Sequence, residues 1–189
     1  MALIIEDGTQ PLNANTYASV SDLDSYVALR GLSIQGSTSQ KEHMLIRAMD
    51  WLEAQSHRYK GYRKQQEQLL CWPRNLVILH NVELYTTDNT IANGNENLLT
   101  VQYFPNNKIP KQLIYAQCQL AVDAHTVSLM PTVANATNFN LKKSKVGPIE
   151  DEYFGAKDAR SVRPTLLQAE GWIADLVDGG GFGLTLKRA

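Results

Sequence analysis

Residues Lys41 to Arg74, KEHMLIRAMDWLEAQSHRYKGYRKQQEQLLCWPR, decide the fold of this 189-residue chain. Apolar residues recur in the first half of this stretch at steps of three and four, the spacing of one helical face: Leu45, Ala48, Met49, Trp51 and Leu52. The spacing predicts an amphipathic helix over about 40–55. Because one face of this helix is apolar, we expect Trp51 and Leu52 to lie in the core.

The second half of the stretch begins with a basic-aromatic run, Arg58 to Lys64 (RYKGYRK), which breaks the helical period. We predict a second, short helix over Gln65 to Leu70. Proline disfavours a helical conformation in the residue before it, so Pro73 should end this helix near Cys71.

Before the central stretch, Leu3-Ile4-Ile5 suits a short strand or an arm. Ser21, with Asp24 three residues later, resembles a capping box and predicts a helix over about 21–30. Ser39 or Thr38 is the expected cap of the central helix.

After the central stretch, β-prone runs at 76–79, 82–85 and 98–104 predict a β-hairpin with a long polar tip. Pro110 suits the first position of a broad apolar helix over about 110–129. Pro164 should start a last helix, and the glycines from Gly179 should end it.

Pro148 restricts the segment 145–153 to a sheet edge or an extended arm. The predicted fold class is therefore mainly α: a small helical bundle with a β-hairpin and extended terminal arms. We expect a single domain over 1–178, with 76–107 as a hairpin or insertion, and a C-terminal arm over 179–189.

The composition is that of an ordinary globular protein, with 43% hydrophobic and 20% charged residues. No apolar run approaches the roughly 20 residues that span a bilayer, and the start of the chain lacks the features of a secretory signal. We expect a cytosolic setting, or a particle assembled there. The formal net charge of −1 argues against a dedicated nucleic-acid binder.

We find no catalytic residues and expect no enzyme, no metal site and no cofactor. The four histidines share no ligand spacing with the two cysteines, Cys71 and Cys118, which suit reduced thiols in the core. The glycine-rich stretch 179–183 follows a helix rather than a strand, so it predicts a hinge rather than a phosphate loop.

Cations beside aromatic rings are the candidates for contact with a polyanion, since cations neutralise phosphates and tyrosine rings stack on bases. A turn or a protein interface explains the same residues. The candidates are Arg58, Lys60, Arg63 and Lys64 in the basic-aromatic run, and Lys142, Lys143 and Lys145 further along.

Several motifs together resemble a family of tailed-phage proteins. The first is the central stretch, a helix, a basic-aromatic turn and a short helix that ends in Trp-Pro-Arg. The start of the chain, Lys145 to Tyr153, and Gly179 to Gly183 with its Leu-Thr-Leu-Lys-Arg tail are also similar to the family. The segment 76–107 departs from it. The family is catalogued as DnaT-like and single-stranded-DNA-binding, and its members act in virions as head-to-tail adaptors.

The resemblance implies a structural virion protein of bacteriophage, a head-to-tail connector at the neck. Its partners would be a homo-oligomeric, dodecameric ring around the DNA channel, the portal protein, and tail or neck proteins, with weak non-specific DNA contact. The alternative is a single-stranded-DNA-binding accessory protein of replication or of the primosome. The near-neutral charge favours the adaptor, because a lumen must let DNA pass without gripping it.

The C-terminal arm has the period of a strand with one apolar face, as Phe182, Leu184 and Leu186 alternate with polar or small residues. We expect it, with Lys187 and Arg188, to bind a neighbouring subunit or the portal by adding a strand to a sheet edge. The other possibility is pairing with the same subunit's segment 146–153.

Overall fold

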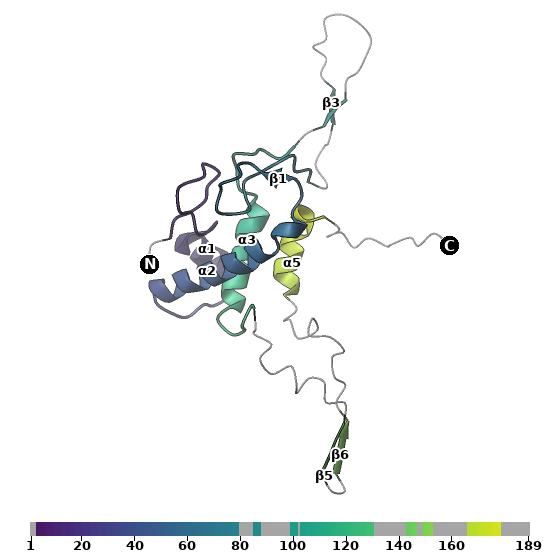
Figure 1. Ribbon diagram of the computed structural model, residues 1–189. Helices are drawn as coiled ribbons and strands as arrows, with labels where there is room; N and C mark the ends of the chain where they lie inside the picture. Colours follow the sequence, from purple (N-terminus) through teal and green to yellow (C-terminus); the bar gives the residue numbers. More distant parts are fainter. Residues whose placement is uncertain are drawn as a thin grey trace, which may run out of the picture.

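The computed structural model describes residues 3–79, 85–87, 99–101, 103–130, 143–146, 149–152 and 166–178. Four helices pack together in this part of the chain: α1 (Val20–Leu29), α2 (Thr38–Ala54), α3 (Lys111–Asp123) and α5 (Leu167–Ile173). α3 packs against α1, α2 and α5 (Figure 1). The predicted mainly α fold is confirmed. The division into a domain over 1–178 and an arm over 179–189 stays a prediction.

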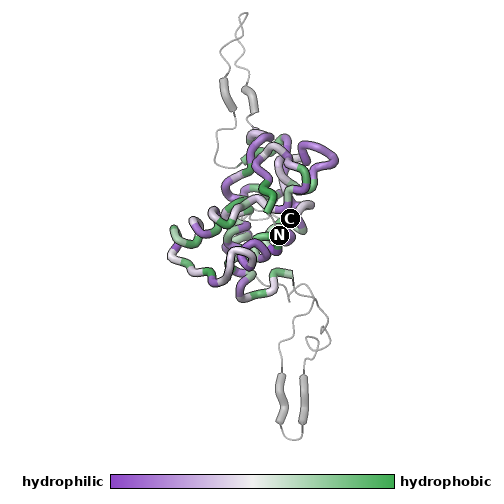
Figure 2. The backbone as a smooth tube through the Cα atoms, turned by 90° about the vertical axis from the view of Figure 1, so that its left-hand side faces the viewer, coloured by the Kyte–Doolittle hydropathy of each residue, from purple (hydrophilic) through white to green (hydrophobic). Residues whose placement is uncertain are grey.

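The core lies where the apolar faces of these helices meet. Trp51 is 8% exposed and Leu52 fully buried, so the predicted core face of α2 is confirmed. Figure 2 shows hydrophilic and hydrophobic residues alternating along the helical body, as expected for helices with one buried face. The largest fully buried side chains include Trp72, Tyr17, Leu23, Leu45, Leu113, Leu120, Ile173 and Leu176.

The helix starts differ from the predicted ones. α1 is capped by Ser19 with Asp22, rather than by Ser21 with Asp24. α2 is capped by Ser37 with Gln40, rather than by Thr38 or Ser39. In both caps the side chains of the two residues bond reciprocally to each other's backbone N–H, which satisfies two donors at the helix start.

The third and last helices are shorter than predicted. Pro110 is the cap of α3 rather than its first helical residue, and the helix ends at Asp123 instead of 129. Tight turns replace the helix from Ala124, where the N–H of His125 bonds to Val122 and that of Thr126 to Asp123. α5 continues into one 3-10 turn, η3 (Ala174–Leu176), and position 164 lies outside the described residues.

The described strands form three antiparallel pairs: β1 (Tyr62–Arg63) with β2 (Arg74–Asn75), β3 (Tyr85–Thr87) with β4 (Leu99–Val101), and β5 (Lys143–Val146) with β6 (Ile149–Glu152). β3 and β4 confirm a hairpin within 76–107, but residues 76–79 form no strand. Of the two possibilities predicted for 145–153, the described residues confirm the sheet edge and not the extended arm, because β6 pairs back onto β5 in a two-stranded sheet. Near the start of the chain, Ile5 makes a single parallel bridge with Thr16 instead of a strand.

The predicted helix over Gln65 to Leu70 is wrong, since these residues form turns. The buried Gln68 carboxamide explains the difference. Its Oε1 accepts from the N–H of Gln65 at 2.9 Å, and its Nε2 donates to the carbonyls of Leu70 at 2.8 Å and Pro73 at 3.0 Å. These side-chain bonds satisfy backbone groups at the two ends of the segment and hold it in turns.

Both cysteines are fully buried, and the loss of water around them raises the pKa of Cys71 to about 11 and that of Cys118 to about 12. We expect neither thiol to react with a soluble disulfide reagent at pH 8 until the protein unfolds. The unfolded chain deprotonates these thiols at lower pH than the folded chain, so stability should fall as the pH rises from about 9 towards these values. Thiol titration and urea unfolding at several pH values measure both effects, and rapid labelling of the folded protein would contradict them.

Candidate nucleic-acid interface

The basic-aromatic run is held on both sides by backbone hydrogen bonds. On one side, the N–H of Lys60 bonds to Leu176 O at 3.0 Å, and the N–H of Asp178 bonds to Arg58 O at 2.7 Å. On the other side, β1 pairs with β2, with Tyr62 opposite Asn75. The run, which begins at the end of a 3-10 turn and includes β1, is therefore held in place along its length.

Two residues shape this segment. Gly61 has φ +68°, and a Cβ there would lie 2.1 Å from the carbonyl oxygen of Asn75, so only glycine fits. The buried guanidinium of Arg74 donates hydrogen bonds to four carbonyl oxygens, three of them in the run: those of Tyr59, Lys60, Gly61 and Cys71. Arg74 thus fixes the path of the run from its inner side.

The cations predicted as contacts differ in what they can reach. The Lys60 ammonium donates to the carbonyls of Ile78 at 3.2 Å and Asp175 at 2.8 Å, and it lies 3.8 Å from the Asp175 carboxylate. Arg58 is half-buried and donates to Gln55 Oε1 at 3.0 Å. Arg63 is exposed, and Lys64 is half-buried like Arg58. Arg63 is therefore the cation of the run that faces solvent most.

The structure does not test the other predicted contacts. Lys142 and the arm residues Phe182, Leu184, Leu186, Lys187 and Arg188 lie outside the described residues. Lys143 and Lys145 belong to β5, for which only the backbone is described.

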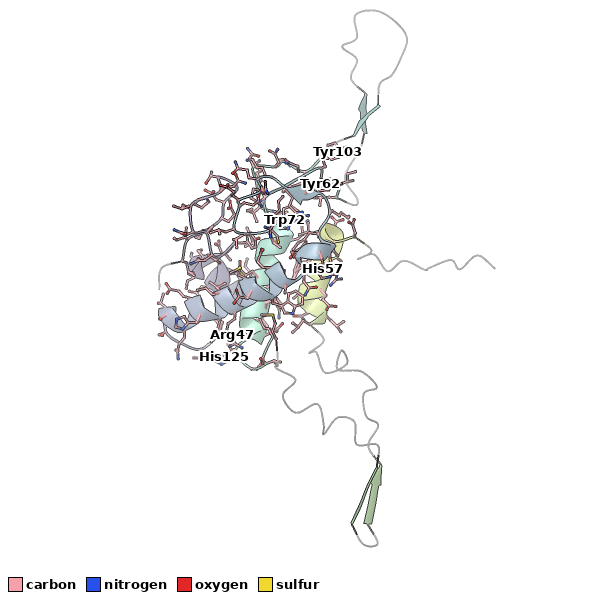
Figure 3. The ribbon with its side chains drawn as sticks, viewed as in Figure 1. Arg47, His57, Tyr62, Trp72, Tyr103 and His125 are labelled. Carbon is pink, nitrogen blue, oxygen red and sulfur yellow. The ribbon has the colours of Figure 1, made fainter. Side chains whose placement is uncertain are left out.

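A further segment, 103–106, lies beside residues 75–77 at the end of β2. The N–H of Phe104 bonds to Val77 O at 2.8 Å, and Asn106 Nδ2 bonds to Asn75 Oδ1 at 2.8 Å. Tyr62 is 70% exposed and Tyr103 is 48% exposed. Figure 3 shows both tyrosines at the same end of the body, beside β1. Two exposed rings therefore share this end of the surface.

Next to this surface is a cavity of about 480 Å³, here called the aromatic pocket, lined by Leu79, Phe104, Lys108, Ile109, Lys111, Gln112, Tyr115 and Trp172. Phe104 packs edge-on against the buried Trp72, with ring centroids 6.2 Å apart. Tyr115 and Trp172 form a second edge-on pair, with centroids 5.2 Å apart. The rings of the pocket are thus held by their neighbours, while Lys108 and Lys111 are exposed.

This arrangement suits a ligand with a planar ring and a negative charge. Aromatic side chains that are already fixed offer a stacking surface at little cost in conformational entropy. Two lysines at the same pocket can neutralise an anionic group. None of these residues is among the contacts predicted from the sequence. The only signal was the closeness of Phe104, Lys108, Lys111 and Tyr115 in the chain.

The described residues hold no group of three histidine, cysteine or acidic side chains that could bind a metal ion. None of the helices in the described ranges is long and apolar enough to cross a membrane. The candidate site thus consists of aromatic rings, amides and cations.

A family model described as "Putative DnaT-like ssDNA binding protein" matches residues 1–93 and 95–189, and the chain belongs to this family. The description names a binding protein rather than an enzyme. Neither the curated proteins nor the solved structures contain a match.

The expected head-to-tail adaptor is wrong, because the model that matches nearly the whole chain describes DNA binding and not a connector. The same correction applies to the expectations that rested on that resemblance: the dodecameric ring, the portal and tail partners, and the place in a virion. The charge argument that favoured the adaptor failed for a physical reason. A net charge of −1 sums over the whole chain and says nothing about where cations gather.

Proposed function

We propose that this protein binds single-stranded DNA as an accessory protein of replication, with the aromatic pocket as its main contact. The observation that carries the proposal is a pocket in which Phe104, Tyr115 and Trp172 lie together with two exposed lysines. A base stacks on the rings, and Lys108 and Lys111 bind the adjoining phosphates. The family description supports the same ligand. The protein acts by binding, without a catalytic step.

The pocket favours a single strand over a duplex. In a duplex each base is stacked and paired, so entering the pocket would require the energy of flipping it out. In a single strand the base faces are accessible. Tyr62 and Tyr103 extend the contact along the neighbouring surface, where both rings are exposed.

We expect the protein to bind a single-stranded oligonucleotide of about 16 nucleotides with a dissociation constant of about 1–100 μM, or lower, at about 0.15 M salt. A duplex of the same sequence should bind at least about tenfold more weakly. Fluorescence anisotropy of labelled DNA measures both. Binding should also change tryptophan fluorescence, because Trp172 is half-exposed at the pocket while Trp51 and Trp72 are buried.

Two variants separate stacking from charge. Phe104→Leu should weaken binding about fivefold or more and leave its salt dependence unchanged. Lys108→Gln with Lys111→Gln should reduce the slope of log affinity against log salt by about 1.4, which corresponds to two phosphate contacts on a single strand. Arg47→Gln is the control, because Arg47 is an exposed cation that bonds to Ala124 O. Equal binding to duplex, or pocket variants that bind like the control, would overturn the proposal.

A further inference from the structure

Trp172 lines a second cavity as well as the aromatic pocket. This cavity has a volume of about 550 Å³ and is here called the Arg30 cavity; its lining is Tyr26, Arg30, Leu32, Gln119, Gln168, Gly171 and Trp172. It is formed by residues of α1, α3 and α5 and the turn after α1. One indole therefore contributes to two neighbouring cavities.

Arg30 is held among three aromatic rings. Its guanidinium carbon lies 3.8 Å from the centroid of Tyr26, 5.0 Å from that of Tyr115 and 5.3 Å from that of Trp172. Stacking of this kind restricts the guanidinium to one plane and leaves the N–H groups at its edge available. Within the described residues it has one long hydrogen bond, from Nη1 to Tyr26 O at 3.5 Å, and no ion pair with a carboxylate.

The rings around Arg30 are themselves fixed. Trp172 Nε1 donates to the Tyr26 hydroxyl at 3.3 Å, and that hydroxyl donates to Gln119 Oε1 at 2.9 Å. The rings of Tyr26 and Tyr115 are 5.8 Å apart between centroids. The Arg30 cavity thus offers an oriented cation, a fixed indole and the exposed amide of Gln168.

We infer that the Arg30 cavity is a second nucleotide subsite, so that one DNA strand crosses Trp172 with neighbouring nucleotides in the two cavities. Arg30 binds a phosphate of this strand through two parallel N–H···O bonds, for which a planar guanidinium is suited and an ammonium is not. A base beside it packs against the indole. This inference rests on the proposed function. It adds a second nucleotide-binding position and identifies Arg30 as a residue that binds the phosphate backbone.

The test compares the full-length protein with three variants, using the same labelled oligonucleotide over a range of salt concentrations. Arg30→Gln should weaken binding about tenfold at low salt and reduce the salt slope by about 0.7, the value for one phosphate on a single strand. Arg30→Lys should keep the wild-type slope but bind about threefold or more weakly, because the ammonium loses the fork geometry and the stacking. Arg47→Gln should match the wild type.

The outcomes distinguish the two proposals. If the wild-type protein binds no single-stranded DNA, the proposed function is wrong and the subsite falls with it. If the wild type binds and the Lys108 and Lys111 variants weaken it, but Arg30→Gln keeps the wild-type affinity and slope, the second subsite is wrong and the proposed function stands. Circular dichroism and thermal melting of each variant show whether a loss reflects unfolding. Arg30→Lys, which keeps a cation over the rings, remains informative if Arg30→Gln does not fold.

Discussion

Trp72→Ala is expected to lower the free energy of unfolding by about 3–5 kcal/mol, the range for removing a large aromatic side chain from a core. Trp72 is fully buried and is among the largest such side chains. Its ring packs edge-on against Tyr59, with centroids 6.0 Å apart, and against Phe104 at 6.2 Å. The truncation removes these contacts and leaves a cavity that the rigid surroundings fill only in part. Urea unfolding measures the change from the shift of the midpoint at constant slope.

Two matched variants sharpen this test. The indole Nε1 of Trp72 has no hydrogen-bond partner among the described residues, so Trp72→Phe loses packing but no hydrogen bond and should cost clearly less than the alanine variant. Tyr62→Ala removes a ring that is 70% exposed and should change stability by about 0.5 kcal/mol or less. A loss below about 1 kcal/mol for Trp72→Ala would show that the side chain is not part of the core.

The same variant has a consequence for binding. Trp72 supports Phe104, which lines the aromatic pocket. A cavity behind Phe104 allows its ring to move. Stacking of a base must then fix the ring, and this costs conformational entropy. Trp72→Ala should therefore also weaken DNA binding under conditions where the protein is still folded.

The long helices could be predicted from the sequence because their signal is local. Cap-like residues and the three- and four-residue spacing placed α1 and α2 to within about two residues, and the spacing identified Trp51 and Leu52 as core. The errors at the helix starts have a simple origin. Ser19 with Asp22 and Ser21 with Asp24 both have the spacing of a capping box, and tertiary packing decides between them.

The structure of the segment Gln65 to Leu70 could not be predicted from its local sequence. Its composition allows a helix, but a helix this short gains little from its own hydrogen bonds. The structure instead uses Gln68 to bond to Pro73, and to Gln10 at 3.0 Å, from a distant part of the chain. The glutamate Glu53 of α2 accepts from the N–H of Cys71 at 2.9 Å. Gln10 and Glu53 lie too far along the chain to be seen in a local window.

The aromatic pocket could not be predicted for the same reason. Its lining combines Leu79, the segment 104–115 and Trp172, which the packing of α5 on α3 brings together. The basic-aromatic run was recognised from its composition, but the sequence did not show that Lys60 is tied to Asp175 while Arg63 faces solvent. Net charge was a poor guide, since stacking on rings depends on their position rather than on the charge of the chain.

Arg74→Met is expected to destabilise the protein by about 3 kcal/mol or more and to release the basic-aromatic run. Arg74 is 7% exposed. Its guanidinium donates from Nε to Lys60 O at 2.7 Å, from Nη1 to Cys71 O at 3.3 Å, and from Nη2 to Tyr59 O at 3.2 Å and Gly61 O at 2.7 Å. Methionine is comparable in length and apolar, so it leaves these carbonyls without their donors. Hydrogen bonds from a charged group contribute about 1.5–3 kcal/mol each, and their losses are not additive.

The substitution acts on the part of the run that carries Tyr62 and Arg63, so stability, proteolysis and DNA binding should change together. Urea unfolding gives the free energy, and trypsin should cleave the variant faster after Arg58, Arg63 or Lys64, because their backbone is no longer held. Arg74→Lys should recover only part of the stability, since three donors on one ammonium cannot reach four carbonyls set for a planar fork. Arg63→Met, at an exposed neighbour whose Nη2 donates to Cys71 Sγ at 3.4 Å, is the matched control and should cost about 1 kcal/mol or less. An Arg74→Met protein as stable as Arg63→Met and as resistant to trypsin as the wild type would contradict this prediction. It would mean that the four carbonyls do not need the guanidinium, and that backbone pairing with β2 and with residues 176–178 holds the run by itself.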